Sequence, residues 1–340
     1  MRKFLLVLII MIIANTLLIA CKNDNSKEVV IYTSVDRNYA EPVLKKFEEV
    51  SKINVKAVYD TEAVKTTGLV NRLITEADNP VADVFWNGEF SQTVRLKDEG
   101  VLDKYKSPKI SSNDNMYSDE EGHWSAFGGR ARVFLVNKNK LNPEQYPQSI
   151  FDILNPSFHA DKIGIANPIF GTTATHSAAL YNILGEKEAE KFFDDIISRG
   201  VSVVDGNSVV RDMVVDGSLY FGLTDTDDSL SAIKKGAPVE IVFPDQDEGA
   251  MGTLVVPNTI SLIKNCPNPD EAKTLIDFIL GEEGKDMLIE SGWINVSSLP
   301  DDKGQYTFQG NKIKTMDITL NEIYEKLSTS KKSLTKKFIK

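Results

Sequence analysis

Short apolar runs alternate with amphipathic stretches along most of this chain, and this alternation constrains the fold more than any other feature. The run at residues 29–33 has the length and composition of a buried strand. The stretch 39–50 that follows carries apolar residues at helical spacing. Strands that are buried on both faces and separated by helices form a mostly parallel sheet covered by helices. The sequence therefore predicts an α/β fold.

The alternation restarts in the middle of the chain, which predicts two α/β units. Strands are expected at residues 29–33, 55–59, 83–86, 130–136, 163–166, 201–204, 219–224, 239–242, 253–256 and 259–263. Helices are expected at residues 39–50, 66–77, 93–99, 173–184, 186–199, 208–216, 228–235, 269–280 and 282–291. The segments near 126–136 and 251–260 are predicted to cross between the two units.

The first twenty residues have the anatomy of a secretory signal peptide. Arg2 and Lys3 precede an uncharged run at residues 4–20, which is short for a membrane-spanning helix. The sequence Leu-Ile-Ala-Cys at 18–21 resembles a bacterial lipobox, in which cleavage leaves Cys21 as the lipidated first residue. We therefore predict a signal peptide at 1–20, a polar tether at 21–28, and a lipid anchor that holds the protein at the periplasmic or extracellular face of a bacterial membrane.

Composition and charge exclude several classes of function. The chain carries 39 basic and 49 acidic residues, a net charge of −10, whereas proteins that bind nucleic acids normally carry a basic excess. Cys266 is the only other cysteine, so a disulfide framework and a cysteine-based zinc site are excluded. The GxSxG, Walker A and GxGxxG motifs are missing. We expect a protein that is not an enzyme, has no catalytic cofactor and binds no nucleic acid.

The loops that follow the strands hold the candidate ligand-binding residues, because ligands of open α/β sheets bind at the carboxyl ends of the strands. Asp225, Asp227 and Asp228 form the densest acidic cluster among these loops. Carboxylates at this spacing suit a hard cation, which prefers oxygen ligands. Capping of the next helix is the alternative interpretation.

Two further loops end at helix N-termini, where exposed N–H groups favour an anion. Thr172 and Thr173 begin one of these helices, and Asn207 and Ser208 begin the other. Ordinary capping by hydroxyl side chains accounts for these residues equally well. Two such helix ends facing one cleft indicate a ligand site more strongly than one does.

The remaining candidates combine aromatic, acidic and basic side chains. Four of them follow strands: Asp36 and Arg37 after the first, and Trp86 and Glu89 after the third. Trp86 is an equally good core residue. Arg130 and Arg132 lie two residues apart on one expected strand and therefore on the same face. A pair of this kind suits an anion, although ion pairs with nearby acids are the commoner use of buried arginines.

Several stretches resemble the substrate-binding proteins of bacterial ABC importers, and among these the iron(III)-binding branch. The stretches are VVIYTSVDRNYAEPVLKKFEEV, VYDTEAVKTTGLVNRLITEADNPVADVFWNGE, GGRARVFLVN, FGLTDTDD and GTLVVPNTISLIKNCPNPDEAKTLIDFIL. The resemblance implies a two-lobed periplasmic-binding-protein fold, type II-like, in which each lobe is a mostly parallel sheet flanked by helices and crossing strands form the hinge. Lobe 1 would comprise residues 29–128 and 255–312, lobe 2 residues 129–254, and a C-terminal helical tail residues 313–340.

The resemblance also implies a role and a partner. Such proteins capture a solute in the cleft between the lobes, close around it and deliver it to a membrane permease driven by an ATPase. We expect a monomer with this role. An adhesin or surface antigen built on the same scaffold is a further interpretation.

The ligand residues that the resemblance implies are only partly present. Typical members hold ferric iron with a tyrosine pair, where this chain has Thr226, Asp227 and Asp228. Asp36 and Arg37 stand where some members have histidine and tyrosine, and the residues 127–129 (Phe-Gly-Gly) replace another tyrosine. Glu89 lies one position from the family's glutamate.

Two ligand classes therefore remain open. In the first, ferric iron is held by a carboxylate set with a synergistic anion: Glu89, Asp225, Asp227 and Asp228. In the second, the ligand is a small anionic organic solute, such as a phosphonate or an organic acid, bound by arginines and helix N-termini.

Overall fold

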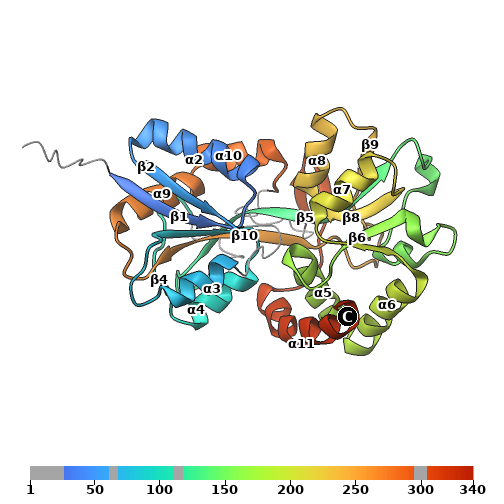
Figure 1. Ribbon diagram of the computed structural model, residues 1–340. Helices are drawn as coiled ribbons and strands as arrows, with labels where there is room; N and C mark the ends of the chain where they lie inside the picture. The colour runs from blue at the N-terminus through green and yellow to red at the C-terminus, as the bar shows by residue number, and fades with distance from the viewer. Residues whose placement is uncertain (1–26, 61–67, 111–117, 295–304, 340) are drawn as a thin grey trace, which may run out of the picture.

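The computed structural model describes residues 27–60, 68–110, 118–294 and 305–339, and it divides into two lobes (Figure 1). The predicted signal peptide and the predicted lipidation site, Cys21, lie outside the described residues. Among the helices that the described ranges contain, none combines the length and the apolar composition needed to cross a membrane.

One ten-stranded sheet runs through both lobes, with the main strand order β2-β1-β3-β10-β5-β8-β6-β7. Lobe 1 holds β1 (Glu28–Thr33), β2 (Asn54–Tyr59), β3 (Val84–Asn87) and β4 (Leu102–Asp103). Lobe 2 holds β6 (Ile163–Ala166), β7 (Ser202–Val204), β8 (Phe221–Asp225) and β9 (Val239–Val242). The first three strands of each set pair in parallel. The mostly parallel, two-lobed α/β fold predicted from the sequence is confirmed.

Two long antiparallel strands join the lobes. β5 (Ser125–Asn137) and β10 (Val255–Ile263) pair with each other, β10 also pairs with β3 of lobe 1, and β5 pairs with β8 of lobe 2. The prediction of two separate strands on either side of Pro257 is wrong, because β10 continues through this residue. The register shifts between Asn258 and Thr259, and such an irregularity is where a sheet tolerates a proline, which cannot donate to the ladder.

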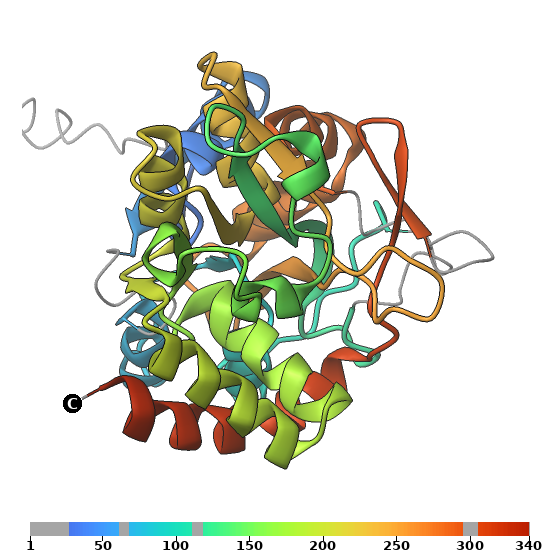
Figure 2. The same cartoon turned by 90° about the vertical axis from the view of Figure 1, so that its right-hand side faces the viewer.

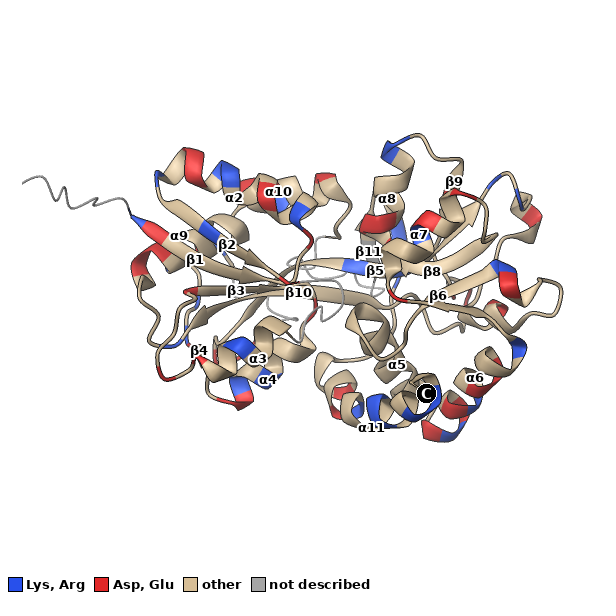
Figure 3. Cartoon of the chain, in the orientation of Figure 1, with Lys and Arg blue, Asp and Glu red and all other residues tan. Residues whose placement is uncertain are grey.

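Helices flank the sheet in both lobes. Lobe 1 has α2 (Arg37–Ser51), α3 (Gly68–Thr75), α4 (Ser91–Asp98), α9 (Pro269–Leu280) and α10 (Glu282–Ser291). Lobe 2 has α5 (Gly171–Ile183), α6 (Glu186–Arg199), α7 (Asn207–Val215) and α8 (Thr226–Lys234), with 3₁₀ turns η2 (Pro143–Gln145), η3 (Ile150–Leu154) and η4 (Ala160–Lys162). Charged residues lie mainly on these helices, and basic residues also mark β5 where it passes between the lobes (Figure 3).

The C-terminal segment contacts both lobes. An unpredicted hairpin of β11 (Gln305–Phe308) and β12 (Asn311–Lys314) precedes α11 (Leu320–Phe338). A capping box of Thr319 and Glu322 begins α11, and the helix packs on α5 and α6 of lobe 2 (Figure 2). The hydroxyl of Tyr324 donates to Asp98 of lobe 1 at 2.9 Å. The tail therefore bridges the two lobes on this side of the molecule.

Each lobe has its own apolar core, and each core also contacts residues of the other lobe. Phe90, just before α4, packs into the core of lobe 2. Leu230 of α8 packs into the core of lobe 1. Gly292 makes room for Leu230, since a Cβ there would lie 2.6 Å from the leucine Cδ1. The lobes are therefore in apolar contact as well as polar contact.

Candidate ligand-binding site

A polar cavity lies between the lobes at the carboxyl ends of the parallel strands, where ligands of open α/β sheets bind. Lobe 1 contributes the loops after β1 and β3, and lobe 2 contributes the loop after β6, the start of α7 and the end of β8. The predicted candidates among its lining residues are Asp36, Glu89, Arg130, Thr172, Thr173, Asn207, Ser208, Asp225 and Asp228. Ser34, Gly88 and Asn167 complete much of the remaining wall.

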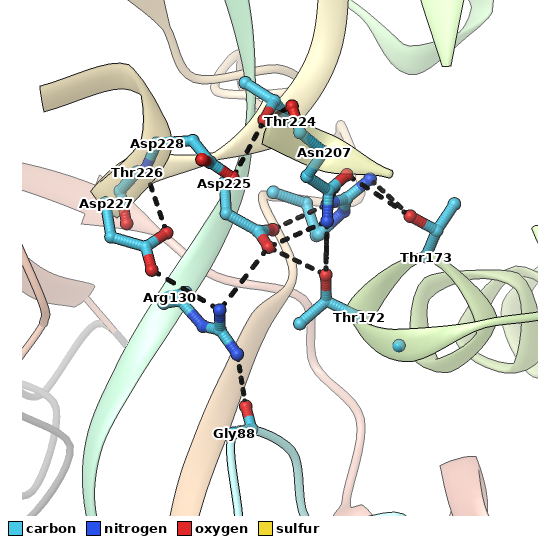
Figure 4. A network of polar contacts seen from close by, with 12 residues as sticks. Gly88, Arg130, Thr172, Thr173, Asn207, Thr224, Asp225, Thr226, Asp227 and Asp228 are labelled. Carbon is cyan, nitrogen blue, oxygen red and sulfur yellow. Dashed lines mark hydrogen bonds and ion pairs between the residues drawn. The ribbon is translucent and has the colours of Figure 1, made fainter. Parts of the chain in front are cut away.

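Arg132 contacts Asp225 and Asn207, which form part of the wall of the cavity in lobe 2 and are labelled in Figure 4. Its side chain is fully buried, and Nη1 lies 2.5 Å from Asp225 Oδ1 and 3.0 Å from Asn207 Oδ1. Nη2 donates to the Thr173 hydroxyl at 3.2 Å. The other Asp225 oxygen accepts from the Thr172 hydroxyl at 2.8 Å and from Asn207 Nδ2 at 3.0 Å. This network fixes β5, β8 and the first turns of α5 and α7 to one another.

Arg130 links the two lobes. Nη1 lies 3.3 Å from Asp227 Oδ2 and 3.9 Å from Asp225 Oδ2, both in lobe 2. Nη2 donates to the Gly88 carbonyl in lobe 1. A Cβ at Gly88 would lie 2.8 Å from Nη2, so glycine permits this approach. Both arginines thus make ion pairs with acids, the commoner of the two uses expected from the sequence.

Three buried carboxylates converge beside these arginines. One oxygen each from Asp225, Asp227 and Asp228 lies within 4.8 Å of the others. Burial and the neighbouring acids raise the pKa of Asp227 to about 6 and that of Asp228 well above its usual range. Burial also opposes ionisation of Asp225, but Arg132 and Arg130 outweigh it and lower its pKa. Burial and the neighbouring acids therefore oppose the ionisation of Asp227 and Asp228 more than their arginine partners favour it.

The polar side chains at the N-termini of α5, α7 and α8 hydrogen-bond mainly within the network around Arg132, and less to the N–H groups of their own helices. Asp225 is the N-cap residue of α8, yet it makes no capping bond through its side chain, which contacts Arg132. The N-cap residues of α5 and α7, Phe170 and Gly206, make none either. The N–H groups that begin these helices thus face the cavity without side-chain caps, as an anion-binding surface requires.

The remaining candidates have different positions. The Glu89 carboxylate accepts from the Ser91 and Gln92 N–H groups at 2.8 and 3.2 Å, and therefore caps α4. Arg37 stacks on the Tyr59 ring, 4.4 Å from its centroid, and does not line the cavity.

Trp86 belongs to the interior of lobe 1. It is fully buried, and its ring packs near Phe127 and Trp293 at centroid distances of 5.8 and 6.1 Å. The structure places it in the core, which was the alternative interpretation of this residue.

Two residues that contact the carboxylate cluster, Tyr39 and Arg211, were not identified from the sequence. The Tyr39 hydroxyl donates to the Asp227 carbonyl at 3.1 Å, across the cleft, and Arg211 Nη1 lies 2.8 Å from Asp228 Oδ1. Tyr39 fits the apolar face of its helix, so its pattern predicts only packing. Arg211 follows Asn207 by four residues, and this spacing places both on one face of α7.

His176 gives the protein a pH-dependent stability. Burial, and then Arg132, lower the pKa of this histidine to about 3. Below about pH 6.5 this histidine takes up a proton in the unfolded chain but not in the folded chain. The free energy of unfolding therefore falls as the pH drops from about 6.5 towards 3. We expect His176→Phe to remove about 3 kcal/mol of this loss at about pH 4. Urea unfolding of both proteins at several pH values measures the difference, and parallel curves would contradict the assignment.

A charged cavity between two α/β lobes is an arrangement typical of solute-binding proteins. Residues 79–314 match the family of bacterial extracellular solute-binding proteins, and the chain belongs to this family. The sequence-based prediction of a solute-binding protein is thereby confirmed.

Curated relatives of the chain are named for two kinds of ligand. Iron uptake protein A1 of Synechocystis is 23% identical over 279 residues, 78% of this chain and 75% of the relative. The major ferric iron-binding protein of Neisseria meningitidis is 23% identical over 266 residues, 76% and 77% of the two chains. A putative 2-aminoethylphosphonate-binding periplasmic protein of Salmonella typhi is 25% identical over 233 residues, 66% of this chain and 65% of the relative.

Solved structures share the two-lobed fold. Iron-bound HitA of Pseudomonas aeruginosa superimposes with a TM-score of 0.74 at 19% identity, over 91% of this chain and 99% of the other. A Trichodesmium protein in complex with iron and citrate superimposes with a TM-score of 0.73 at 20% identity, over 92% and 100%.

Proposed function

We propose that this protein is the extracytoplasmic solute-binding component of an ABC importer, and that it captures ferric iron between its lobes for delivery to a permease driven by an ATPase. Membership of the solute-binding family and the iron-binding relatives support this role. The observation that carries the choice of ligand is the group of three buried carboxylates, whose oxygens lie within 4.8 Å of one another.

The charges of this group favour a hard cation. Ferric iron prefers oxygen ligands, and a cation would relieve the repulsion that raises the pKa values of Asp227 and Asp228. Binding would then release protons. Arg132 lowers the pKa of Asp225, and the first turn of α4 holds Glu89. Asp227 and Asp228 also contact arginines, but their pKa values are raised, so they are the principal ligands in this proposal. Arg130 and the N-termini of α5 and α7 would receive a synergistic anion.

A small anionic organic solute is the second candidate, and a separate observation favours it. In the part of the chain that the structure describes, the Nε atoms of Arg130 and Arg132 are buried and lack a hydrogen-bond partner. Arg130 lines the cavity, so an anion there could accept from its Nε, whereas Arg132 is fully buried and does not line the cavity. The relative named for 2-aminoethylphosphonate supports this alternative.

Elemental analysis of protein purified without chelators tests the proposed ligand. We expect close to one iron per chain, and calorimetry should detect iron binding to the stripped protein with release of protons. A metal-free protein that binds phosphonates in calorimetry but not ferric ion would replace the first candidate by the second.

The proposed role includes a lipid anchor at Cys21, because an importer's binding protein must stay near its permease. We expect cells that express the protein to incorporate labelled palmitate into it. Cys21→Ser should abolish the label, since this thiol is the only acylation site in the lipobox. Cys266→Ser is the matched control and should keep full labelling. Persistent labelling of the Cys21→Ser protein would contradict the anchor.

A further inference from the structure

A second, larger space opens beside the cavity between the lobes. It is a groove between α4, the start of α5 and α11, and it shares Glu89, Phe170 and Gly171 with the cavity. Helices α4 and α11 border the same side of the molecule (Figure 1). The cavity measures about 70 Å³ and the groove about 500 Å³. Pockets for organic ligands commonly measure about 300–1,000 Å³, so the volume of the groove lies in this range and that of the cavity lies below it.

The wall of the groove offers an apolar surface at the point where the two spaces meet. Phe170 lines both spaces and is 41% exposed. Ile169, Ala174 and Leu327 extend the apolar wall from α5 to α11. A ligand confined to the cavity would leave this surface in water, whereas a ligand that continues into the groove would cover it.

The charged residues of the groove favour an anion. Arg95 of α4 and Lys331 of α11 both line it, and within the described ranges neither makes an ion pair with a carboxylate. Arg95 Nη1 donates to Asn71 Oδ1 at 3.4 Å. The Glu89 carboxylate is occupied by the first turn of α4, which leaves the exposed Glu325 as the opposing acid.

We propose that the cargo includes an organic polycarboxylate whose body occupies this groove, with Arg95 and Lys331 binding its distal carboxylate and Phe170 its carbon skeleton. The inference rests on the proposed function: ferric ion lies at the carboxylate cluster, one arm of the chelator reaches it past Glu89 and Gly171, and the remainder fills the groove. The protein thus selects a ferric chelate over ferric ion with a small inorganic anion.

Calorimetry with three probes tests the groove: ferric citrate, ferric ion presented with carbonate, and metal-free citrate. We expect Arg95→Ala with Lys331→Ala to weaken ferric citrate about tenfold, the effect of two partly exposed charge contacts, and to change the carbonate form less than twofold. Lys332→Ala with Lys336→Ala removes the same charge from exposed positions of α11 outside the groove, and should change neither.

A pair of tryptophan variants tests the volume independently of charge. Ser328→Trp fills the groove and should weaken ferric citrate, while Thr329→Trp, the next residue but outside the groove, should not. The groove proposal would be wrong if the Arg95→Ala, Lys331→Ala protein or the Ser328→Trp protein weakened the citrate and carbonate forms equally. The proposed binding of iron would be unaffected by that result. A different result would contradict the proposed iron function and support the groove as a binding site. In that result no ferric form binds, metal-free citrate binds, and the Arg95→Ala, Lys331→Ala protein binds citrate more weakly.

Discussion

Ferric ion should lose more than about 100-fold in affinity when Asp227 and Asp228 are both replaced by Asn. The loss of a partner behind a metal ligand already costs about 10- to 100-fold, and this change removes two candidate ligands with their charges. The proton release that accompanies iron binding should fall as well, since the groups with raised pKa values are gone. Calorimetry in two buffers with different ionisation enthalpies measures both quantities.

A matched control separates this effect from a change in net charge. Asp194→Asn with Asp195→Asn also neutralises two adjacent acids, which lie on the surface helix α6 in ion pairs with Lys337 and Lys191. Iron affinity should not change in this control. An anionic solute should bind the Asp227→Asn, Asp228→Asn protein equally well or better, because Arg130 loses an acidic partner. Unchanged iron affinity together with tighter phosphonate binding would favour the second candidate.

Arg132→Met should destabilise the protein by about 3–5 kcal/mol, the cost of leaving one charge of a buried ion pair without its partner. Asp225 would stay in a fully buried position with its arginine gone. Thr173 would also lose the Nη2 donor that binds its hydroxyl. Urea unfolding followed by far-ultraviolet circular dichroism measures the change.

The double variant Arg132→Met with Asp225→Asn identifies the cause. It removes both charges, so most of the lost stability should return. Arg211→Met breaks the more exposed pair with Asp228 and should cost less. If the single and the double variants lose the same stability, packing of the arginine chain, and not the unpaired carboxylate, accounts for the loss.

The architecture was predictable because it depends on local periodicity. Helices α6, α9 and α10 begin and end at the predicted residues, and in α9 the proline and acids of the first turn mark the start. The hairpin of β11 and β12 was missed because its strands have only four residues each, and an alternation as short as that at 305–308 does not identify a strand by itself. Pro257 was misinterpreted because an irregularity that tolerates proline depends on the neighbouring strands.

The sequence by itself determined the two α/β units, the crossing strands and the loops that could hold a ligand. Buried strands and amphipathic helices each have a characteristic order of apolar and polar residues, which can be recognised in the sequence. It did not determine what the charged residues of those loops do. Arg132 and Asp225 are 93 residues apart, and Tyr39 and Asp227 are 188 apart. Only the tertiary structure brings such pairs together, and with them it decided which acids are neutralised, which keep raised pKa values, and that Arg37 and Trp86 lie outside the cavity. Electrostatic interactions depend on distance and burial, and neither is a local property of the chain.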